Sequence, residues 1–390
     1  MLKKRFALLL MMALLGIGSG RAWAATLAIS DIKAEPVIGY GGTGGNILYI
    51  GGMYGATAGK TTFTISRDPQ TGNIILSWTG ANPVLYFMGG NGTGQYSNTY
   101  SASVWTPVAS SSDFSAVATV NGVSSITHTG ANKQAEFYYK AVPAAVDSVK
   151  TQVDPKGNGK TYFETSPAVG KMDISLVAGF NFISLPYIFD TGNDALEKVF
   201  GNQLQSGGTP SSADEVYFKS DANSWGMTNA FPKSDGHWYL SAAPASLVTF
   251  AVNRAYGYLI SVKNSSFTKT NPKKITTVGI VSTADQALAL NPGFNAFGVV
   301  YPVAVSLDNL GLNSVTNVKS GSVPSSADEI YFKNDPTSWG MTNVFLKSDG
   351  HWYLSASPST ATTFGLSLPY GYFYSMKTPG VTINWNRRFQ

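Results

Sequence analysis

Short stretches of alternating apolar and polar residues make up most of the chain, and turn residues separate them. TTFTISRD begins at Thr61, NIILSW ends at Trp78, and VLYFM begins at Val84. Alternation with a period of two predicts half-buried β-strands. SSITHTG and AEFYYKAV continue the pattern as far as Val142. This series of short strands indicates an antiparallel sandwich over residues 61–145.

The second half of the chain contains a block that occurs twice. One copy, from Gly207, reads GGTPSSADEVYFKSDANSWGMTNAFPKSDGHWYL, and the other, from Gly321, reads GSVPSSADEIYFKNDPTSWGMTNVFLKSDGHWYL. Each block lies in a larger unit that opens with an alternating strand, a Gly-Phe-Asn turn and an apolar strand, and closes with an aromatic strand. A segment between these parts suits one short helix. Such a unit has the size of a domain, larger than the ~20–50 residues of a solenoid repeat.

These patterns predict an all-β, multidomain protein, with a β-sandwich and two tandem β-rich repeat domains that hold at most a short helix each. The expected segments are a signal peptide (1–24), a glycine-rich N-terminal segment (25–60), the sandwich (61–145), a linker (146–171), repeat module one (172–275) and repeat module two (276–390).

The N-terminus has the three parts of a secretory signal peptide. Lys3, Lys4 and Arg5 supply positive charge, Phe6–Ile17 is a short apolar stretch, and Ala22-Trp23-Ala24 is a small-x-small cleavage site. We therefore expect a secreted protein, located outside the cell or on the surface of a bacterium, with the periplasm as a further compartment. No later stretch has transmembrane length, so we expect no membrane span after cleavage.

Composition removes several classes of function. The chain has no cysteine, which excludes disulfides, thiolate metal sites and cysteine nucleophiles. Its net charge is +5 with 13% charged residues, and no block of like charges is present. This balance is too diffuse for a nucleic-acid partner. No motif for a cofactor is present in a suitable context, and we expect none.

Two resemblances follow from the motifs. Residues 61–145 resemble a fibronectin type III-like domain of bacterial surface proteins through LSW at Leu76–Trp78, VLYF at Val84–Phe87, Trp105 and FYYKAV at Phe137–Val142. The resemblance implies that Trp78 and one of the tyrosines in FYYKAV are core residues. The duplicated unit resembles a recurrent, poorly characterised module of bacterial exported proteins through GFNFISLPY, FGNQLQSGG, ADEV, DGHWY and GYLI in copy one. Copy two departs early, with GFNAFGVVY and no FGNQL element. The second resemblance implies a β-rich secreted or surface module and names no reaction.

The repeated DGHWY motif supplies the first candidate site. Asp235 and His237, with Asp349 and His351, could form a catalytic pair or a metal site. Alternatively, Asp-Gly before an aromatic run predicts a tight hairpin turn, which we favour.

The repeated tryptophans supply the second candidate. Trp225, Trp238, Trp339 and Trp352 could stack on sugar rings, or could pack in β-sheet cores. Trp225 and Trp339 follow polar turns and precede glycine, so they are the better candidates for exposure.

A weaker alternative concerns calcium. Asp214, Glu215, Asp328 and Glu329 could provide oxygen ligands, although their spacing matches no known calcium loop. Glu215 and Lys219 could instead lie on a solvated strand face.

The function predicted from these features is that of a non-catalytic secreted or cell-surface structural or adhesion protein that acts through its tandem β modules. Its expected partners are further copies of itself, in a homo-oligomer or filament, or an extracellular polysaccharide. Exposed β edges with little charge favour strand-to-strand assembly, and tandem modules raise avidity. One alternative is a carbohydrate-binding protein that uses the repeated aromatics. A second is a glycan hydrolase that uses Asp235 and Asp349.

Overall fold

A computed structural model describes the strands β1 (Ile32–Ala34) and β2 (Leu48–Ile50) and residues 63–80, 82–92, 105–143, 168–189, 194–219, 227–282, 286–333 and 341–385. Antiparallel sheets dominate these residues, and the short α2 (Leu196–Val199) is the α-helix among them. The 3₁₀ turns are η2 (Val108–Ser110), η3 (Pro210–Ser212), η4 (Leu312–Ser314) and η5 (Pro324–Ser326). The predicted all-β, multidomain fold is confirmed.

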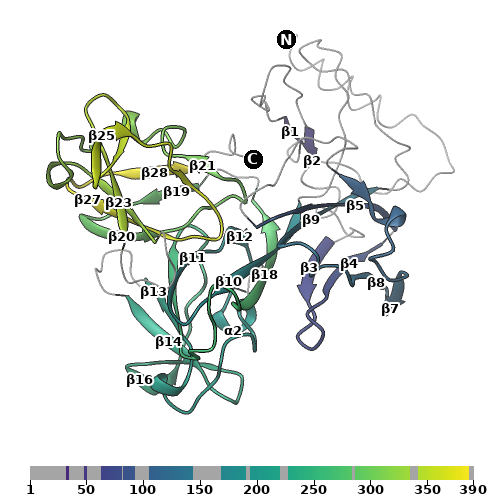
Figure 1. Cartoon of the computed structure of the whole chain (residues 1–390). Helices are drawn as coiled ribbons and strands as arrows, with labels where there is room; N and C mark the ends of the chain where they lie inside the picture. The colour runs from purple at the N-terminus through teal and green to yellow at the C-terminus, as the bar shows by residue number, and fades with distance from the viewer. Residues whose placement is uncertain are drawn as a thin grey trace, which may run out of the picture.

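The first part of the described chain is a β-sandwich (Figure 1). Its four-stranded sheet has the order β3 (Phe63–Arg67), β4 (Ile74–Thr79), β8 (Val123–His128) and β7 (Ala118–Val120). The alternation seen in the sequence buries one face of these strands, with Ile74, Leu76 and Trp78 in the core. Tyr139 on the facing sheet packs in the same cluster, so the strand pattern and the core agree.

The facing sheet connects the sandwich to the repeats, and we call it the joining sheet. Its order is β12 (Tyr187–Ile188), β18 (Lys273–Val281), β10 (Val169–Leu176), β9 (Glu136–Pro143), β5 (Pro83–Gly90) and β6 (Thr106–Pro107). β10 pairs with β9 on one side and with β18 on the other. The segment boundaries expected at 171/172 and 275/276 therefore lie inside strands.

Each repeat copy forms a six-stranded sheet with the same strand order. Copy one has β11 (Gly179–Ser184), β17 (Gly257–Val262), β13 (Glu215–Phe218), β14 (Thr228–Pro232), β15 (Trp238–Leu240) and β16 (Ala243–Leu247). Copy two has β20 (Gly293–Phe297), β27 (Tyr372–Met376), β22 (Glu329–Phe332), β23 (Thr342–Leu346), β24 (Trp352–Leu354) and β25 (Ser357–Ala361). Two small ribbons complete copy two, β19 (Gln286–Ala289) with β28 (Thr382–Trp385), and β21 (Val305–Ser306) with β26 (Gly365–Leu366).

The Gly-Phe-Asn motif fixes the start of each copy's sheet. The amide of Asn181 accepts the Val177 N–H at 2.9 Å and donates to the Val177 carbonyl at 2.8 Å. Asn295 makes the equivalent pair of bonds with Asn291. The glycine two residues before each asparagine has a φ near +90°, which favours glycine. The repeated motif is therefore a turn in which one side chain supplies the missing backbone partners.

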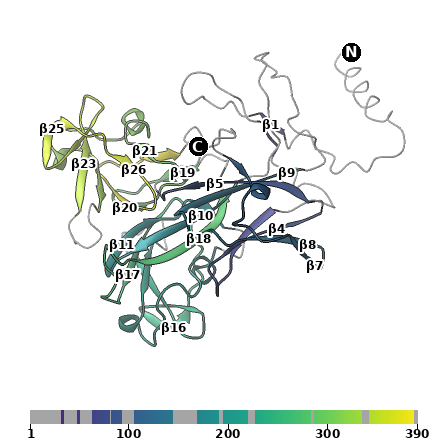
Figure 2. The ribbon, with the colours of Figure 1, turned by 45° about the vertical axis from the view of Figure 1, so that its right-hand side comes forward.

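The two copies dock through reciprocal hydrogen bonds near β11 and β20, which lie close together in Figures 1 and 2. The Ser184 N–H donates to the Pro369 carbonyl at 2.7 Å, and the Gly298 N–H donates to the Ala255 carbonyl at 2.9 Å. Ser184 and Gly298 are corresponding positions of the two copies, as are Ala255 and Pro369. Each copy thus gives the other the same backbone contact.

Aromatic packing and close backbone approach reinforce this docking. The rings of Phe182 and Phe373 lie 4.3 Å apart between centroids. A Cβ added at Gly371 would lie 2.6 Å from the Ile183 carbonyl oxygen, and one at Gly257 would lie 2.8 Å from the Phe297 oxygen. One continuous hydrophobic cluster includes buried side chains from both copies and from the joining sheet. The copies therefore form one packed body.

We predict that Gly371→Ala destabilises the docked copies. The new methyl group meets backbone on the other copy, so relief requires movement of a packed strand, at a cost of about 2 kcal/mol. Urea unfolding followed by tryptophan fluorescence measures the loss. Gly208→Ala is the matched control, because its Cβ meets nothing within 4 Å; equal stability of the two variants would contradict the prediction.

His128 is a buried titratable group in the sandwich core. Its Nδ1 lies 2.7 Å from the Tyr139 hydroxyl, and its ring stacks on Phe114 with 4.2 Å between centroids. Burial disfavours the charged imidazolium and lowers the pKa of His128 from its usual 6.5 to about 4. The imidazole is therefore a neutral core residue at pH 7.

We predict that this burial makes the protein less stable in mild acid. Between pH 6.5 and about 4 the unfolded chain binds a proton at His128 that the folded chain does not, so stability falls as the pH falls through this window. The contribution is on the order of 2 kcal/mol after an allowance for solvent screening. Urea midpoints at pH 7 and pH 4.5 are compared between the wild type and His128→Gln. The wild type is expected to lose more, and equal losses would count against this origin.

Candidate functional site

The repeated KSDGH segment is an exposed hairpin turn in both copies. In copy one, Asp235 accepts the His237 N–H at 3.0 Å through one oxygen and the Tyr239 hydroxyl at 2.7 Å through the other. Gly236 between them has a φ of +84°. The turn joins β14 to β15 in an antiparallel pair, as the Asp-Gly pair predicts.

Copy two has the same turn with the same bonds. Asp349 accepts the His351 N–H at 3.0 Å and the Tyr353 hydroxyl at 2.6 Å, and Gly350 again has a φ of +84°. The turn joins β23 to β24. The near-identical sequences of the two turns therefore form near-identical exposed surfaces.

A lysine completes each turn. Lys233 places its ammonium group 3.9 Å from the centroid of the Tyr239 ring and donates to the Pro244 carbonyl at 2.7 Å. Lys347 lies 4.1 Å from the Tyr353 ring and donates to the Pro358 carbonyl. Each lysine therefore holds the turn against the outer strand of its sheet.

The hydrogen bonds of the turn favour ionised carboxylates. The His237 N–H, followed by the Tyr239 hydroxyl, lowers the pKa of Asp235. The Tyr353 hydroxyl, followed by the His351 N–H, lowers the pKa of Asp349. The general acid of a glycoside hydrolase needs a raised pKa. The environment of both aspartates acts in the opposite direction.

The two histidines of the motif are exposed and pair with different acids. His237 Nδ1 lies 3.2 Å from Glu197 Oε2, on α2, and His351 Nδ1 lies 3.5 Å from Asp308 Oδ2. More than half of each histidine side chain is accessible to solvent. The histidines can donate and accept hydrogen bonds at the surface of each turn.

The four repeated tryptophans divide into two groups. Trp238 and Trp352 are 2% and 1% exposed and belong to the hydrophobic core, so they present no ring face to a saccharide. Trp238 packs beside Phe200. Trp225 and Trp339 lie outside the described residues, and their assignment as sugar platforms stays a prediction.

Asp214 and Glu215 are buried, and protein donors satisfy them. Asp214 accepts the Lys263 N–H and the Gln205 N–H at 2.9 and 2.8 Å, and pairs with Lys273 Nζ at 3.0 Å. Glu215 pairs with Lys263 Nζ at 2.6 Å. The carboxylates thus tie β13 to the chain that follows β17.

Copy two repeats this arrangement with one exchange. Asp328 accepts the Lys377 N–H at 2.7 Å, and Glu329 pairs with Lys377 Nζ at 3.1 Å. The Tyr374 hydroxyl, at 3.0 Å from Asp328, supplies the donor that Lys273 provides in copy one. Both copies therefore use these acids as structural braces, which leaves few oxygens for calcium.

The solvated strand face considered for Glu215 and Lys219 is wrong. Glu215 is 4% exposed and Lys219 is 8% exposed. The alternating pattern alone does not predict this burial. Other parts of the chain, including the groups that donate hydrogen bonds to Glu215, cover the second face of β13.

Across the described stretches, no group of three or more His, Asp or Glu side chains is arranged to hold a metal ion. Within the same stretches, no helix is long and apolar enough to cross a membrane.

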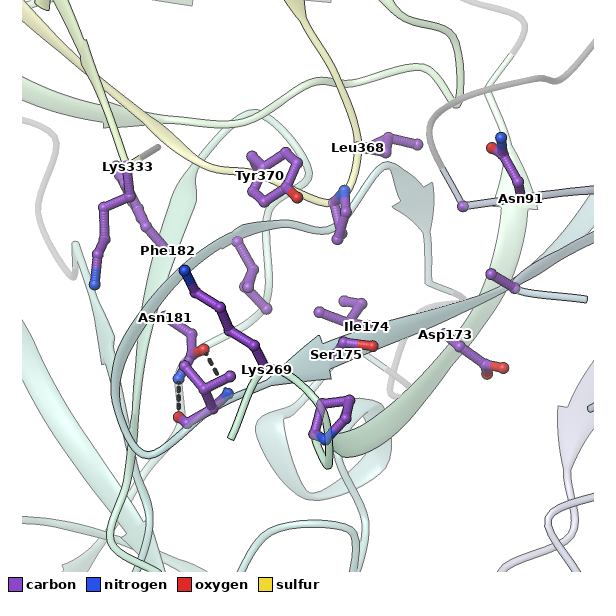
Figure 3. Close-up of a pocket in the computed structure, with 16 residues that line it drawn as sticks. Asn91, Asp173, Ile174, Ser175, Asn181, Phe182, Lys269, Lys333, Leu368 and Tyr370 are labelled. Atoms are coloured by element: carbon purple, nitrogen blue, oxygen red, sulfur yellow. Dashed lines mark hydrogen bonds between the residues drawn. The ribbon is translucent and has the colours of Figure 1, made fainter. Parts of the chain in front are cut away.

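A cavity of about 330 Å³ lies where the sandwich and both copies meet (Figure 3). Asn91 comes from the sandwich, Asp173 and Lys269 from the region of copy one, and Lys333 and Tyr370 from copy two. Asp173 is paired with Lys171 at 2.6 Å, and Lys333 donates to the Phe180 carbonyl at 2.6 Å. The Lys333 contact therefore helps to hold the two copies together, whereas the Lys171–Asp173 pair lies within β10.

Sequence reasoning missed this cavity because its residues lie far apart in the chain. No local motif joins Asn91 to Tyr370, and only tertiary packing brings them together. The repeat offset shows that Tyr370 of copy two is equivalent to Tyr256 of copy one. It does not predict that Tyr370 lies against copy one.

Comparisons with protein-family models, with curated proteins and with solved structures each found no match to this chain. The two resemblances drawn from sequence motifs therefore stay predictions, and the residues themselves carry the functional argument.

We predict that two acidic positions of copy one, both repeated in copy two, differ sharply in their effect on stability. Asp214→Asn places an amide N–H₂ against backbone donors and an ammonium group, so it lowers the free energy of unfolding by about 3 kcal/mol. Asp235→Asn, at the exposed turn, is expected to cost far less than Asp214→Asn. Urea titration of both variants measures the difference, and similar losses would contradict the assignment of Asp214 as a brace.

Proposed function

We propose that the protein is a non-catalytic, exported structural protein that bridges extracellular material through its two repeated turns. A single observation carries this proposal. The same exposed turn is built twice, with the same hydrogen bonds, on two copies that are packed into one body.

The placement of the turns suits bridging. Each turn is held against the outer strand of its sheet, β16 in copy one and β25 in copy two. Figures 1 and 2 show these two strands at separate ends of the paired copies. A rigid body with equivalent surfaces at two ends can hold two chains or two particles together, and bivalent attachment raises avidity.

Extracellular polysaccharide is the partner that the turn chemistry favours. Asp235 and His237 present a carboxylate and an imidazole to solvent, and a sugar hydroxyl can donate to the first and bond to the second. Tyr239 is half-buried beside them and offers part of an aromatic ring. The equivalent residues Asp349 and His351 repeat the surface.

The structural use of the remaining motif residues supports a non-catalytic function. Asp214, Glu215 and their equivalents are buried braces, and Trp238 and Trp352 fill the core. The residues that the two repeated blocks share therefore include residues that stabilise the fold as well as residues of the exposed turn.

We predict that the mature protein agglutinates polysaccharide-coated beads and that both turns are needed. Beads carrying cellulose, chitin, alginate or peptidoglycan are mixed with the wild type, His237→Ala, His351→Ala and the double variant. Each single variant keeps one turn, so it is expected to bind beads of one type without agglutinating them. Its apparent affinity is expected to fall about a hundredfold because avidity is lost. The double variant is expected to lose binding as well.

Lys319→Ala, an exposed change in copy two outside the turn, is the matched control and should agglutinate as the wild type does. Absence of binding to every bead type, or full agglutination by the double variant, would contradict the proposal.

A further inference from the structure

A groove of about 470 Å³ lies alongside β3, the free edge of the four-stranded sheet. All five residues of β3 line it, as do residues 198 and 199 at the end of α2 and residues 201–203 after it. Thr276, Val278 and Ile280 also contribute; they alternate along β18 and so share one face of that strand. β3 packs against β18 (Figure 1), so the groove runs over the face of the joining sheet.

The second wall of this groove is fixed in place. The side chain of Gln203 donates to the Thr276 carbonyl at 2.9 Å and accepts the Thr276 N–H at 2.6 Å. Because the backbone groups of a strand lie in the plane of its sheet, the segment after α2 is attached along the edge of β18, next to the β18 face that β3 contacts. A groove with walls on both sides admits a single extended segment and excludes the edge of a whole sheet.

The edge of β3 offers backbone hydrogen bonds to such a segment. The Asp68 N–H donates to the Asn73 carbonyl at 2.9 Å, which continues the register of β3 with β4. Because hydrogen-bonded and non-bonded pairs alternate in an antiparallel ladder, Ile65 and Arg67 direct their N–H and C=O groups away from β4. Among the described residues no strand pairs with this side of β3.

Two cations at the groove form no salt bridge with a carboxylate of the described residues. Arg67 Nε is buried without an acceptor there. Lys198 is exposed and forms no ion pair with a described residue. Asp68, the acid next to Arg67, is already used by the turn, where it accepts the Gln70 N–H and the Thr71 hydroxyl. Arg67 and Lys198 are the charged residues of the groove.

We propose that this groove binds an extended peptide segment of another exported protein, which adds as a strand to β3 and directs acidic side chains at Arg67 and Lys198. Main-chain bonds to an exposed sheet edge supply affinity in this recognition mode, and side-chain pockets supply specificity. Val278 and Ile280 provide the apolar surface for every second side chain. Charge complementarity selects the acidic residues.

The other sheet edges show why β3 is the site. Proline stands in the edge strands β6, β16 and β25, where it removes a backbone donor. β11 and β20 lie at the interface between the copies. β7 is open, but the groove runs along β3 at the opposite edge of the sheet. The fold thus protects or covers several edges and leaves a walled slot at β3.

This inference does not rest on the bridging proposed above. The groove lies between the four-stranded sheet and the joining sheet, and the repeated turns lie at the outer strands of the copies. A protein that fails to agglutinate beads can still bind a peptide at β3, and the reverse also holds.

Isothermal titration calorimetry with a synthetic peptide tests the proposal. The probe is a capped six-residue peptide that alternates valine with threonine and glutamate. The same peptide with lysine for glutamate is expected to bind at least about tenfold more weakly, because it places like charges together. The peptide with proline at its centre is expected not to bind, because it cannot complete the ladder. Slower amide exchange at Ile65 and Arg67 when the peptide is bound locates the site.

Four variants separate the contributions. Arg67→Gln and Lys198→Gln are each expected to weaken binding of the glutamate peptide about tenfold, while Lys319→Gln leaves it unchanged. Ile65→Pro removes an outward N–H and is expected to abolish binding; its thermal transition shows whether it remains folded.

No binding of the glutamate peptide to the wild type, or equal binding of the glutamate and lysine peptides, would overturn the inference. Wild-type oligomers that Ile65→Pro converts to monomers would also overturn it, because the groove would then hold a second copy of this chain.

Discussion

A buried carboxylate must receive hydrogen bonds from the protein, and this requirement organises each repeat. Asp214 and Asp328 are removed from water, and the backbone N–H that follows the aromatic strand, at Lys263 or Lys377, supplies one of their partners. β13 and β22 are thereby tied to the ends of their neighbouring strands β17 and β27, which lie far along the chain. A partner lost at such a position leaves an unpaired charge in the core, which costs far more than a lost surface contact. This requirement accounts for the presence of the Ala-Asp-Glu motif in both copies.

The fixed sheets then determine what lies at the surface. Because the buried acids hold β13 and β22, the following hairpins carry the Asp-Gly turns at equivalent places. Docking through β11 and β20 orients the two sheets relative to each other, and the joining sheet connects them to the sandwich. Stability is concentrated in buried polar contacts and the shared core, and the candidate binding surfaces are exposed turns and one groove.

The sequence predicts the fold class well and the tertiary pairing poorly. Alternation around Trp78 and Asp-Gly before Trp238 indicate strands and hairpins, because these signals are local. The same patterns do not predict that β10 pairs with both β9 and β18, because the alternation within a strand does not show which strands pair with it. Burial of Glu215 was missed for a similar reason, because it depends on donors such as Lys263, 48 positions away. The cavity at Tyr370 and the groove at Arg67 depend on packing between distant segments.

The reciprocal contacts between the copies have the form of a symmetric interface. Ser184 meets Pro369 as Gly298 meets Ala255, so each copy contacts the other with the same patch of surface. Such self-complementary contact is the signature of a two-fold symmetric dimer. The tandem arrangement therefore places within one polypeptide the contact geometry of a dimer of two identical subunits. The symmetry is not complete, because the Ser184 hydroxyl accepts the Val299 N–H and Gly298 has no side chain to make the equivalent bond.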